Sequence, residues 1–291
     1  MSSTHTAHPP CRLYVVVARA ADTAVVFRRG PSKWWHILRW DLDSLSVESG
    51  AWLKGQLYPR RSNVSADGKL LGYFALKGEW GAYFAVSKVP WVTALAAWKT
   101  LGTWTTGCVF GPQRELALYG ACLDEEPFHG RYPWPVASQG LFRWRRGRYF
   151  NEYTRGWSAL EADAFAERVA QLQDSGLRFP AHKEPPVIME RRSEDTKRTL
   201  GVCDTTDLTS TAGEVEHEAV YYLTNRKNEP ERLPGIRWAA WDGRGRLLAA
   251  THAGTLEVHA VTRKRHELLW EHDLNGLTPR PVRAPEWAQA W

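Results

Sequence analysis

The sequence of 291 residues predicts an all-β fold assembled from repeated units of antiparallel strands. The first supporting observation is an internal repeat, in which a turn precedes a strand at 65–74 and again at 241–251. A weaker copy lies at 111–119, and equivalent positions of the three copies are 46 and 131 residues apart. The longer separation is close to three steps of about 44 residues, a length typical of repeated four-stranded units. The second observation is the content of 16 Trp against 2 Met, because these stiff rings suit packing between stacked sheets.

Short runs of β-branched and apolar residues predict strands along the first half of the chain. Residues 1–10 have no such pattern and are expected to be disordered. Glycine and proline divide the strand-rich stretch 70–118, and 141–153 has the pattern of a further hairpin around Arg-Arg-Gly. The strands expected in the first two hairpins are 13–17, 24–27, 35–41 and 46–54.

One helix stands out against this background, at about 159–174. Ser158 and Glu161 have the spacing of a capping box, in which each side chain bonds a free amide at the helix start. Apolar residues follow at helical spacing until a Ser-Gly pair ends the pattern. The helix and a proline-rich linker form an expected insertion at about 157–186 in a single domain covering 11–291.

The clearest repeated unit is 236–271, where four short strands joined by tight turns predict an antiparallel meander. Its strands are expected at 236–241, 247–251, 256–261 and 267–271. The Ser-Ala-Asp-Gly-Lys-Leu-Leu-Gly-Tyr motif within 65–75 resembles blades of TolB and WD40-like β-propellers, and 236–271 resembles one whole blade. This resemblance implies a β-propeller-like ring of four to six blades, of which five are favoured. A closed ring of this kind removes exposed sheet edges.

Several classes of protein are disfavoured by what the sequence lacks. No apolar run reaches the ~20 residues that span a bilayer, and no secretory signal pattern begins the chain. The four cysteines form no C-x-x-C pair, as expected for reduced thiols in a cytoplasm. Phosphate-binding glycine motifs, a nucleophile elbow and a zinc-protease motif are missing as well. We therefore predict a cytoplasmic, bacterial protein with no cofactor and no metal site.

Two basic and aromatic clusters are the candidate binding sites. Residues 1–156 carry 20 basic and 11 acidic residues, whereas 157–291 carry 18 and 21. Arginine pairs with phosphates or carboxylates, and a neighbouring ring offers a stacking surface, as in proteins that bind single strands or RNA. The alternative is that these arginines are solvated turn residues and the rings belong to the core. The candidate residues are Arg28, Arg29, Lys33, Trp34, Arg143, Arg145, Arg146 and Arg148.

Three functions follow from these patterns. A rigid repeat platform with many loops favours a non-catalytic scaffold that binds protein partners in a larger assembly. The first alternative is an accessory subunit that contacts RNA or single-stranded DNA through the basic-aromatic face. The second is a propeller hydrolase or lyase whose residues converge from separate blades, although an enzyme is the less favoured interpretation.

Overall fold

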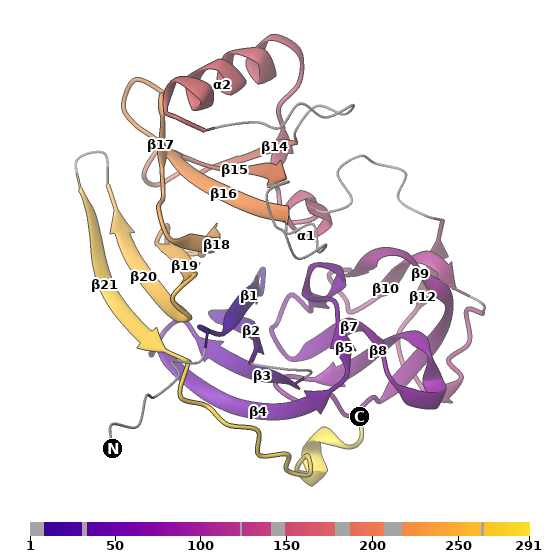
Figure 1. Ribbon diagram of the computed structural model, residues 1–291. Helices are drawn as coiled ribbons and strands as arrows, with labels where there is room; N and C mark the ends of the chain where they lie inside the picture. Colours follow the sequence, from indigo (N-terminus) through magenta and orange to yellow (C-terminus); the bar gives the residue numbers. More distant parts are fainter. Residues whose placement is uncertain are drawn as a thin grey trace, which may run out of the picture.

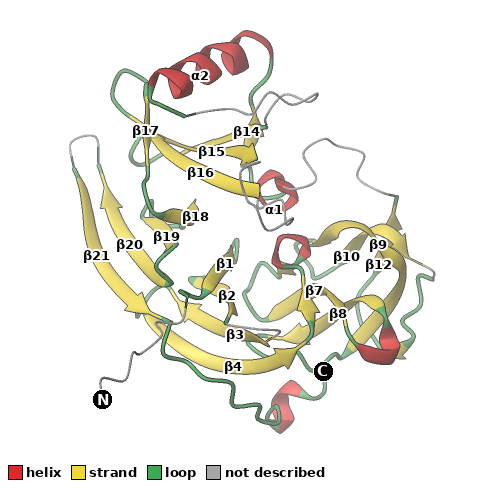
Figure 2. Cartoon of the chain, viewed as in Figure 1, coloured by secondary structure: helices red, strands yellow, loops and turns green. Residues whose placement is uncertain are grey.

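The computed structural model is mostly β, as the sequence predicts, and its strands form four sheets among the described residues (Figures 1 and 2). Two α-helices are described, and neither is long and apolar enough to cross a membrane. The residues that the structure describes are 9–30, 34–122, 124–140, 149–177, 187–206, 217–262 and 265–291.

The first sheet is an antiparallel meander in the order β1-β2-β3-β4. Its central strand β2 is buried at every position but the last, because both of its faces pack against other parts of the molecule. The two hairpins predicted from the sequence are confirmed, with ends that differ by two residues at most. The bounds are β1 Arg12–Val17, β2 Thr23–Arg29, β3 Trp34–Asp41 and β4 Ser46–Lys54.

The second sheet has eight strands, and the 15-residue strand β9 joins its two parts. The start of β9 pairs with β8, and the remainder pairs with β10. The expectation of purely antiparallel strands is wrong here, because β10 and β12 are parallel. The bounds are β5 Gln56–Leu57, β6 Asn63–Val64, β7 Leu70–Leu76, β8 Ala82–Lys88, β9 Ala96–Phe110, β10 Leu116–Cys122, β11 His129–Gly130 and β12 Val136–Gln139, with short 3-10 turns η1 Pro59–Arg61 and η2 Gly78–Trp80.

The third sheet carries the predicted helix, α2, at Ala162–Asp174. The predicted capping box is wrong, because Ser158 lies in strand β13 and the Glu161 side chain makes no capping hydrogen bond. The predicted hairpin at 141–153 is also wrong where it is described, because α1 occupies Phe150–Tyr153; residues 141–148 lie outside the described residues. The strands are β13 Ser158–Ala159, β14 Ile188–Arg192, β15 Thr199–Thr206, β16 His217–Thr224 and β17 Pro230–Arg232.

The fourth sheet confirms the meander predicted at 236–271, with strand order β18-β19-β20-β21. Each predicted strand lies within one residue of the observed start, and the last extends two residues further. The bounds are β18 Ile236–Trp241, β19 Leu247–Thr251, β20 Thr255–Val261 and β21 His266–Asp273.

The internal repeat has a counterpart in the backbone. Gly68, Arg114 and Gly245 occupy equivalent positions of the three turns, and their φ angles are 72°, 68° and 72°. Glycine adopts this left-handed conformation without steric cost. Arg114 adopts it while its guanidinium pairs with Asp67 at 2.5 Å, an interaction that joins two of the repeated turns.

Neighbouring sheets share hydrophobic cores. One core joins the first and second sheets, and another joins the third and fourth. A third core contains side chains of β1–β3 together with side chains of β18–β20, so the first and last sheets also pack together. Trp40 and Trp270 stack in this contact with centroids 5.5 Å apart. The four sheets therefore lie around a common centre (Figure 1).

The C-terminal segment 274–291 packs back on the body. It leaves β21, crosses below β4 and ends beside the second sheet (Figure 1). Trp291 donates its indole N–H to the Arg131 carbonyl and packs edge-on against Tyr132 and Trp134. The segment thus links the fourth sheet to the second across the first.

Candidate anion-binding site

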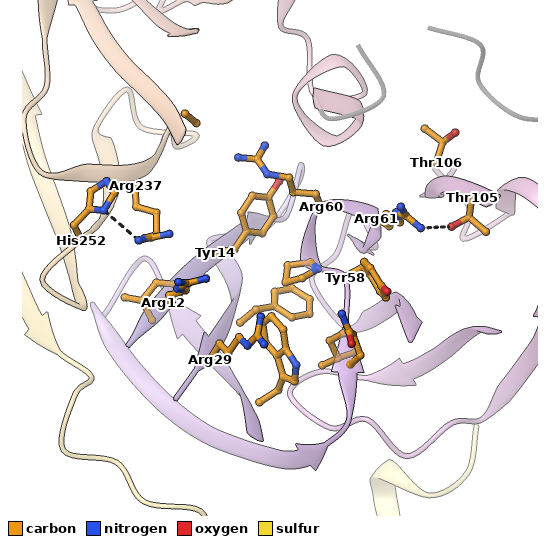
Figure 3. Close-up of a pocket in the computed structure, with 17 residues that line it drawn as sticks. Arg12, Tyr14, Arg29, Tyr58, Arg60, Arg61, Thr105, Thr106, Arg237 and His252 are labelled. Carbon is orange, nitrogen blue, oxygen red and sulfur yellow. Dashed lines mark hydrogen bonds between the residues drawn. The ribbon is translucent and has the colours of Figure 1, made fainter. Parts of the chain in front are cut away.

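A cavity of about 590 Å³ lies at the common centre and is lined by residues from all four sheets (Figure 3). Its wall is basic, because five arginines and one histidine line it and none of the described lining residues is Asp or Glu. The volume lies in the usual range of small-molecule sites. The basic lining residues are Arg12, Arg29, Arg60, Arg61, Arg237 and His252.

Arg12 and Arg29 lie opposite one another on β1 and β2. Both side chains are exposed to the cavity side, and the Arg29 guanidinium lies 5.5 Å from the centroid of the Trp35 ring. Like charges directly opposite on paired strands repel one another and destabilise the pair. An anion between the two guanidinium groups would remove this repulsion.

The 3-10 turn η1 contributes Arg61 on another side of the cavity. Its Nη1 donates to the Thr103 carbonyl at 2.9 Å and to Thr105 Oγ1 at 3.0 Å. The guanidinium also stacks 4.8 Å from the Tyr58 ring centroid. These contacts fix the side chain, and burial lowers the pKa of Arg61 from its ordinary value.

Arg60 is held between aromatic rings and one carboxylate. Its guanidinium lies 5.3 Å from the Tyr14 ring centroid and 5.4 Å from that of Tyr149. Arg60 Nη1 is 3.5 Å from Oε1 of Glu152, a residue of α1 that is only 5% exposed. Burial raises the pKa of the Glu152 carboxyl, and the nearby charge of Arg60 opposes that rise. Glu152 contacts Arg60 but is not itself one of the residues that line the cavity.

The fourth sheet supplies Arg237 and His252. Arg237 Nη2 donates to His252 Nδ1 at 3.1 Å. Figure 3 shows Arg237, Arg61 and Arg29 approaching the cavity from different sides. Thr105 and Thr106 add hydroxyl groups, so the cavity offers several hydrogen-bond donors around a compact space. The described residues contain no group of three or more His, Cys, Asp or Glu side chains arranged to hold a metal ion.

The residues selected from the sequence do not form one surface where they are described. Arg28 is 1% exposed and donates to the carbonyls of Leu274 and Asn275 at 2.6 and 3.0 Å, so it fixes the C-terminal segment. Arg29 lines the central cavity, whereas Trp34 is half-buried with the Lys54 amine 6.0 Å from its ring centroid. Residues Lys33, Arg143, Arg145, Arg146 and Arg148 lie outside the described residues.

Sequence reasoning missed four of the cavity arginines. Arg12 and Arg237 are single basic residues at strand starts, and nothing in their local sequence sets them apart. The Pro-Arg-Arg sequence at 59–61 was the available signal, because a short basic turn between strands can point both side chains to one side.

Comparisons with known proteins identify no family. No family model matches the chain, and no curated protein matches it. Among solved structures, it is similar to the crystal structure of an uncharacterized protein from Listeria monocytogenes EGD-e, at 6% identity and a TM-score of 0.26. The match covers 91% of this chain and 66% of that one.

Proposed function

We propose that the protein is a β-propeller-like binding module whose central cavity holds a small molecule carrying two or more phosphate groups. The observation that carries this proposal is the cavity wall, with five arginines and no lining carboxylate among the described residues. Arginine forks match the geometry of phosphate oxygens and bind them with paired hydrogen bonds. Because the basic groups surround the space, a compact anion with several charged groups fits it better than a single carboxylate.

The propeller-like part of the proposal is supported by the shared cores. The first and second sheets share a core, as do the third and fourth, and side chains near residue 15 share a core with side chains near residue 250. The two halves of β9 pair with different neighbours, so the second sheet divides into two smaller groups of strands. With these groups counted separately, the arrangement favours five blade-like units around the cavity.

The size of the cavity favours a small molecule over a nucleic-acid strand. A volume of about 590 Å³ suits a ligand the size of a nucleotide, whereas a strand requires a continuous basic groove. Arg28, which the sequence predicts on a nucleic-acid face, is buried against backbone carbonyls instead.

Isothermal titration calorimetry with pyrophosphate at low salt tests the proposal. We expect one-site binding that weakens as salt is added, because salt screens the charges that attract the anion. The variant R12Q/R29Q should lose at least tenfold in affinity, since a hydrogen bond to a charged group contributes roughly 1.5–3 kcal/mol. A matched control, R192Q/R232Q, removes two exposed arginines of the third sheet and should bind as the wild type does.

The result that contradicts the proposal is the absence of binding heat with pyrophosphate at low salt. Equal loss of affinity in both double variants would contradict it as well, because net charge and not the cavity would then govern binding. A single-stranded DNA oligomer serves as the competing probe. Tighter binding of the oligomer than of pyrophosphate would favour the nucleic-acid alternative.

A second candidate is the scaffold role that the sequence predicts, and one observation favours it. Leu101 and Trp104 of β9 are 61% and 70% exposed, beside residues that line the cavity. Large exposed apolar side chains often mark protein contacts. A photo-crosslinking residue at position 104 should capture one discrete protein in cells, whereas the same residue at the exposed Arg232 of β17 should not. No adduct at 104 would contradict this role.

A further inference from the structure

We infer that Glu152 couples anion binding in the central cavity to the uptake of one proton. This inference rests on the proposed function, and it assigns a regulatory role to a residue that lies outside the cavity wall. Glu152 is 5% exposed and pairs with Arg60, which does line the cavity. The Arg60 guanidinium is therefore shared between a buried carboxylate on one side and the anion site on the other.

Glu152 lies between two cavities. Arg60 lines the central one, and Glu152 lines a second cavity of about 390 Å³, while Tyr14 lines both. Within the described residues, neither Glu152 carboxylate oxygen has a hydrogen-bond partner of normal geometry. Its ion pair with Arg60, at 3.5 Å, is correspondingly long. The carboxylate thus has Arg60 as its ion-pair partner, and it also lines the second cavity.

The groups that face Glu152 act on it in opposite directions. Burial disfavours the ionised form and is the largest effect. The Arg60 charge favours the ionised form, as do the Glu152 backbone amide, the Arg155 charge and the Tyr14 hydroxyl. The net result is a pKa above the ordinary value of 4.5. The Arg155 charge is itself opposed by Arg19 and Arg191 beside it. The titratable and charged groups around Glu152 are Tyr14 of β1, Arg60 of η1, Arg155 after α1 and Tyr221 of β16. Two further arginines act on Arg155, namely Arg19 after β1 and Arg191 of β14.

An anion that reaches Arg60 meets the negative charge of Glu152 across the same guanidinium. The two negative charges repel, so the bound anion raises the pKa of Glu152 further. A proton from solvent then adds to the carboxylate oxygen, and it leaves again when the anion leaves. Because linkage is reciprocal, protonation of Glu152 must strengthen anion binding by the same factor. Affinity therefore rises as pH falls through the pKa of Glu152.

Calorimetry with sulfate tests this coupling, since sulfate keeps its two charges across the pH range used. We expect the affinity of the wild type to rise by up to about tenfold for each pH unit of acidification, the limit for one linked proton. Titrations in two buffers of different ionisation enthalpy should show net proton uptake approaching one. This count uses the unaltered protein, so it does not depend on whether a variant folds.

Two variants assign the proton. E152Q keeps the shape of the side chain without its charge, and it should bind sulfate with the low-pH affinity at every pH and take up no proton. His252 lines the same cavity, so H252Q is the control for a change in a lining residue. H252Q should keep the uptake even where it lowers affinity.

Three outcomes overturn the inference. Sulfate binding with an affinity that does not change with pH overturns it and leaves the proposed function standing. Proton uptake that persists in E152Q also overturns it, because the proton then binds elsewhere. Absence of sulfate and pyrophosphate binding at every pH overturns both this inference and the proposed function.

Discussion

Arginine has different surroundings in the outer turns of the molecule and in its central cavity. In the outer turns, Arg246 bonds Asp242 at 2.7 Å and Arg244 bonds Asp22 at 2.8 Å. In the cavity, Arg12 faces Arg29, and the remaining neighbours include aromatic rings and threonine hydroxyls. The outer arginines thus complete turns within the protein, whereas the cavity arginines concentrate positive charge in one space.

This difference has an energetic consequence. Removing an outer arginine leaves a carboxylate without its partner, which costs stability. Removing Arg12 or Arg29 relieves repulsion between like charges on paired strands and costs binding instead. Substitutions in the outer turns should therefore lower stability, whereas substitutions of Arg12 and Arg29 should lower ligand affinity. The following variants test this contrast.

The largest expected loss of stability comes from replacing a core tryptophan at the end of β18, next to the outer turn that contains Asp242. Trp241 is 3% exposed and donates its indole N–H to the Arg191 carbonyl at 3.1 Å. W241A should lower the free energy of unfolding by roughly 3–5 kcal/mol, because it leaves a large cavity. W270A should cost less, since Trp270 is only half-buried. Urea unfolding measures both, and an unchanged midpoint for W241A would show that the ring is dispensable.

The next largest effect is a pH dependence of stability, and it arises on the face of β2 opposite to Arg29. His36 faces Arg28 across the strands, and burial followed by the Arg28 charge lowers its pKa from 6.5 to about 4. Between these values the unfolded chain binds a proton that the folded protein excludes. Stability is therefore unaffected above pH 6.5 and falls as pH decreases from 6.5 toward 4, by up to about 3 kcal/mol. Urea unfolding at pH 7 and pH 4.5 measures the difference in unfolding free energy between the two pH values, and H36Q should reduce that difference. The same difference in H36Q and in the wild type would show that other groups cause the loss of stability.

An outer arginine should give a smaller loss. Asp242 has no exposed side-chain surface, and Arg246 is its ion-pair partner. R246Q should cost about 1–3 kcal/mol, because the carboxylate keeps only its bonds to backbone amides. Chemical unfolding gives the stability and calorimetry gives the affinity for pyrophosphate. If R246Q lowered the affinity for pyrophosphate and left the stability unchanged, the contrast between outer and cavity arginines would be wrong.

The smallest change in stability is expected in the cavity. R12Q/R29Q should unfold at the same temperature as the wild type or slightly above it, because a like-charged pair is removed. Scanning calorimetry measures this shift in the same sample used for ligand binding. A clear drop in melting temperature would show that these arginines hold the sheets together, and the contrast with the outer turns would then fail.

Much of the fold follows from local sequence, but the cavity does not. The first and last meanders were predictable because alternating apolar residues and tight turns specify antiparallel neighbours. The helix at Ala162–Asp174 was predictable from its apolar stripe, although its start was not, because Ser158 is recruited into a strand. The parallel pairing of β10 with β12 depends on a loop path that no short motif records.

The position of the site was hidden for a similar reason. Arg28 and Arg29 are adjacent in sequence, yet they point to opposite sides of β2, because successive strand residues alternate. The partner of Arg29 is Arg12, which β1 brings opposite through strand register. Arg237 reaches the same cavity only because the first and last sheets pack together. A search for basic runs finds neighbours in sequence, whereas this site consists of neighbours in space.

Anomalous diffraction from crystals soaked in tungstate would locate an anion bound by the cavity arginines. Tungstate is a tetrahedral dianion that resembles phosphate, and its metal scatters anomalously. We expect the strongest peak inside the cavity, within hydrogen-bonding reach of Arg12 and Arg29. An empty cavity, with peaks confined to the outer surface, would contradict it.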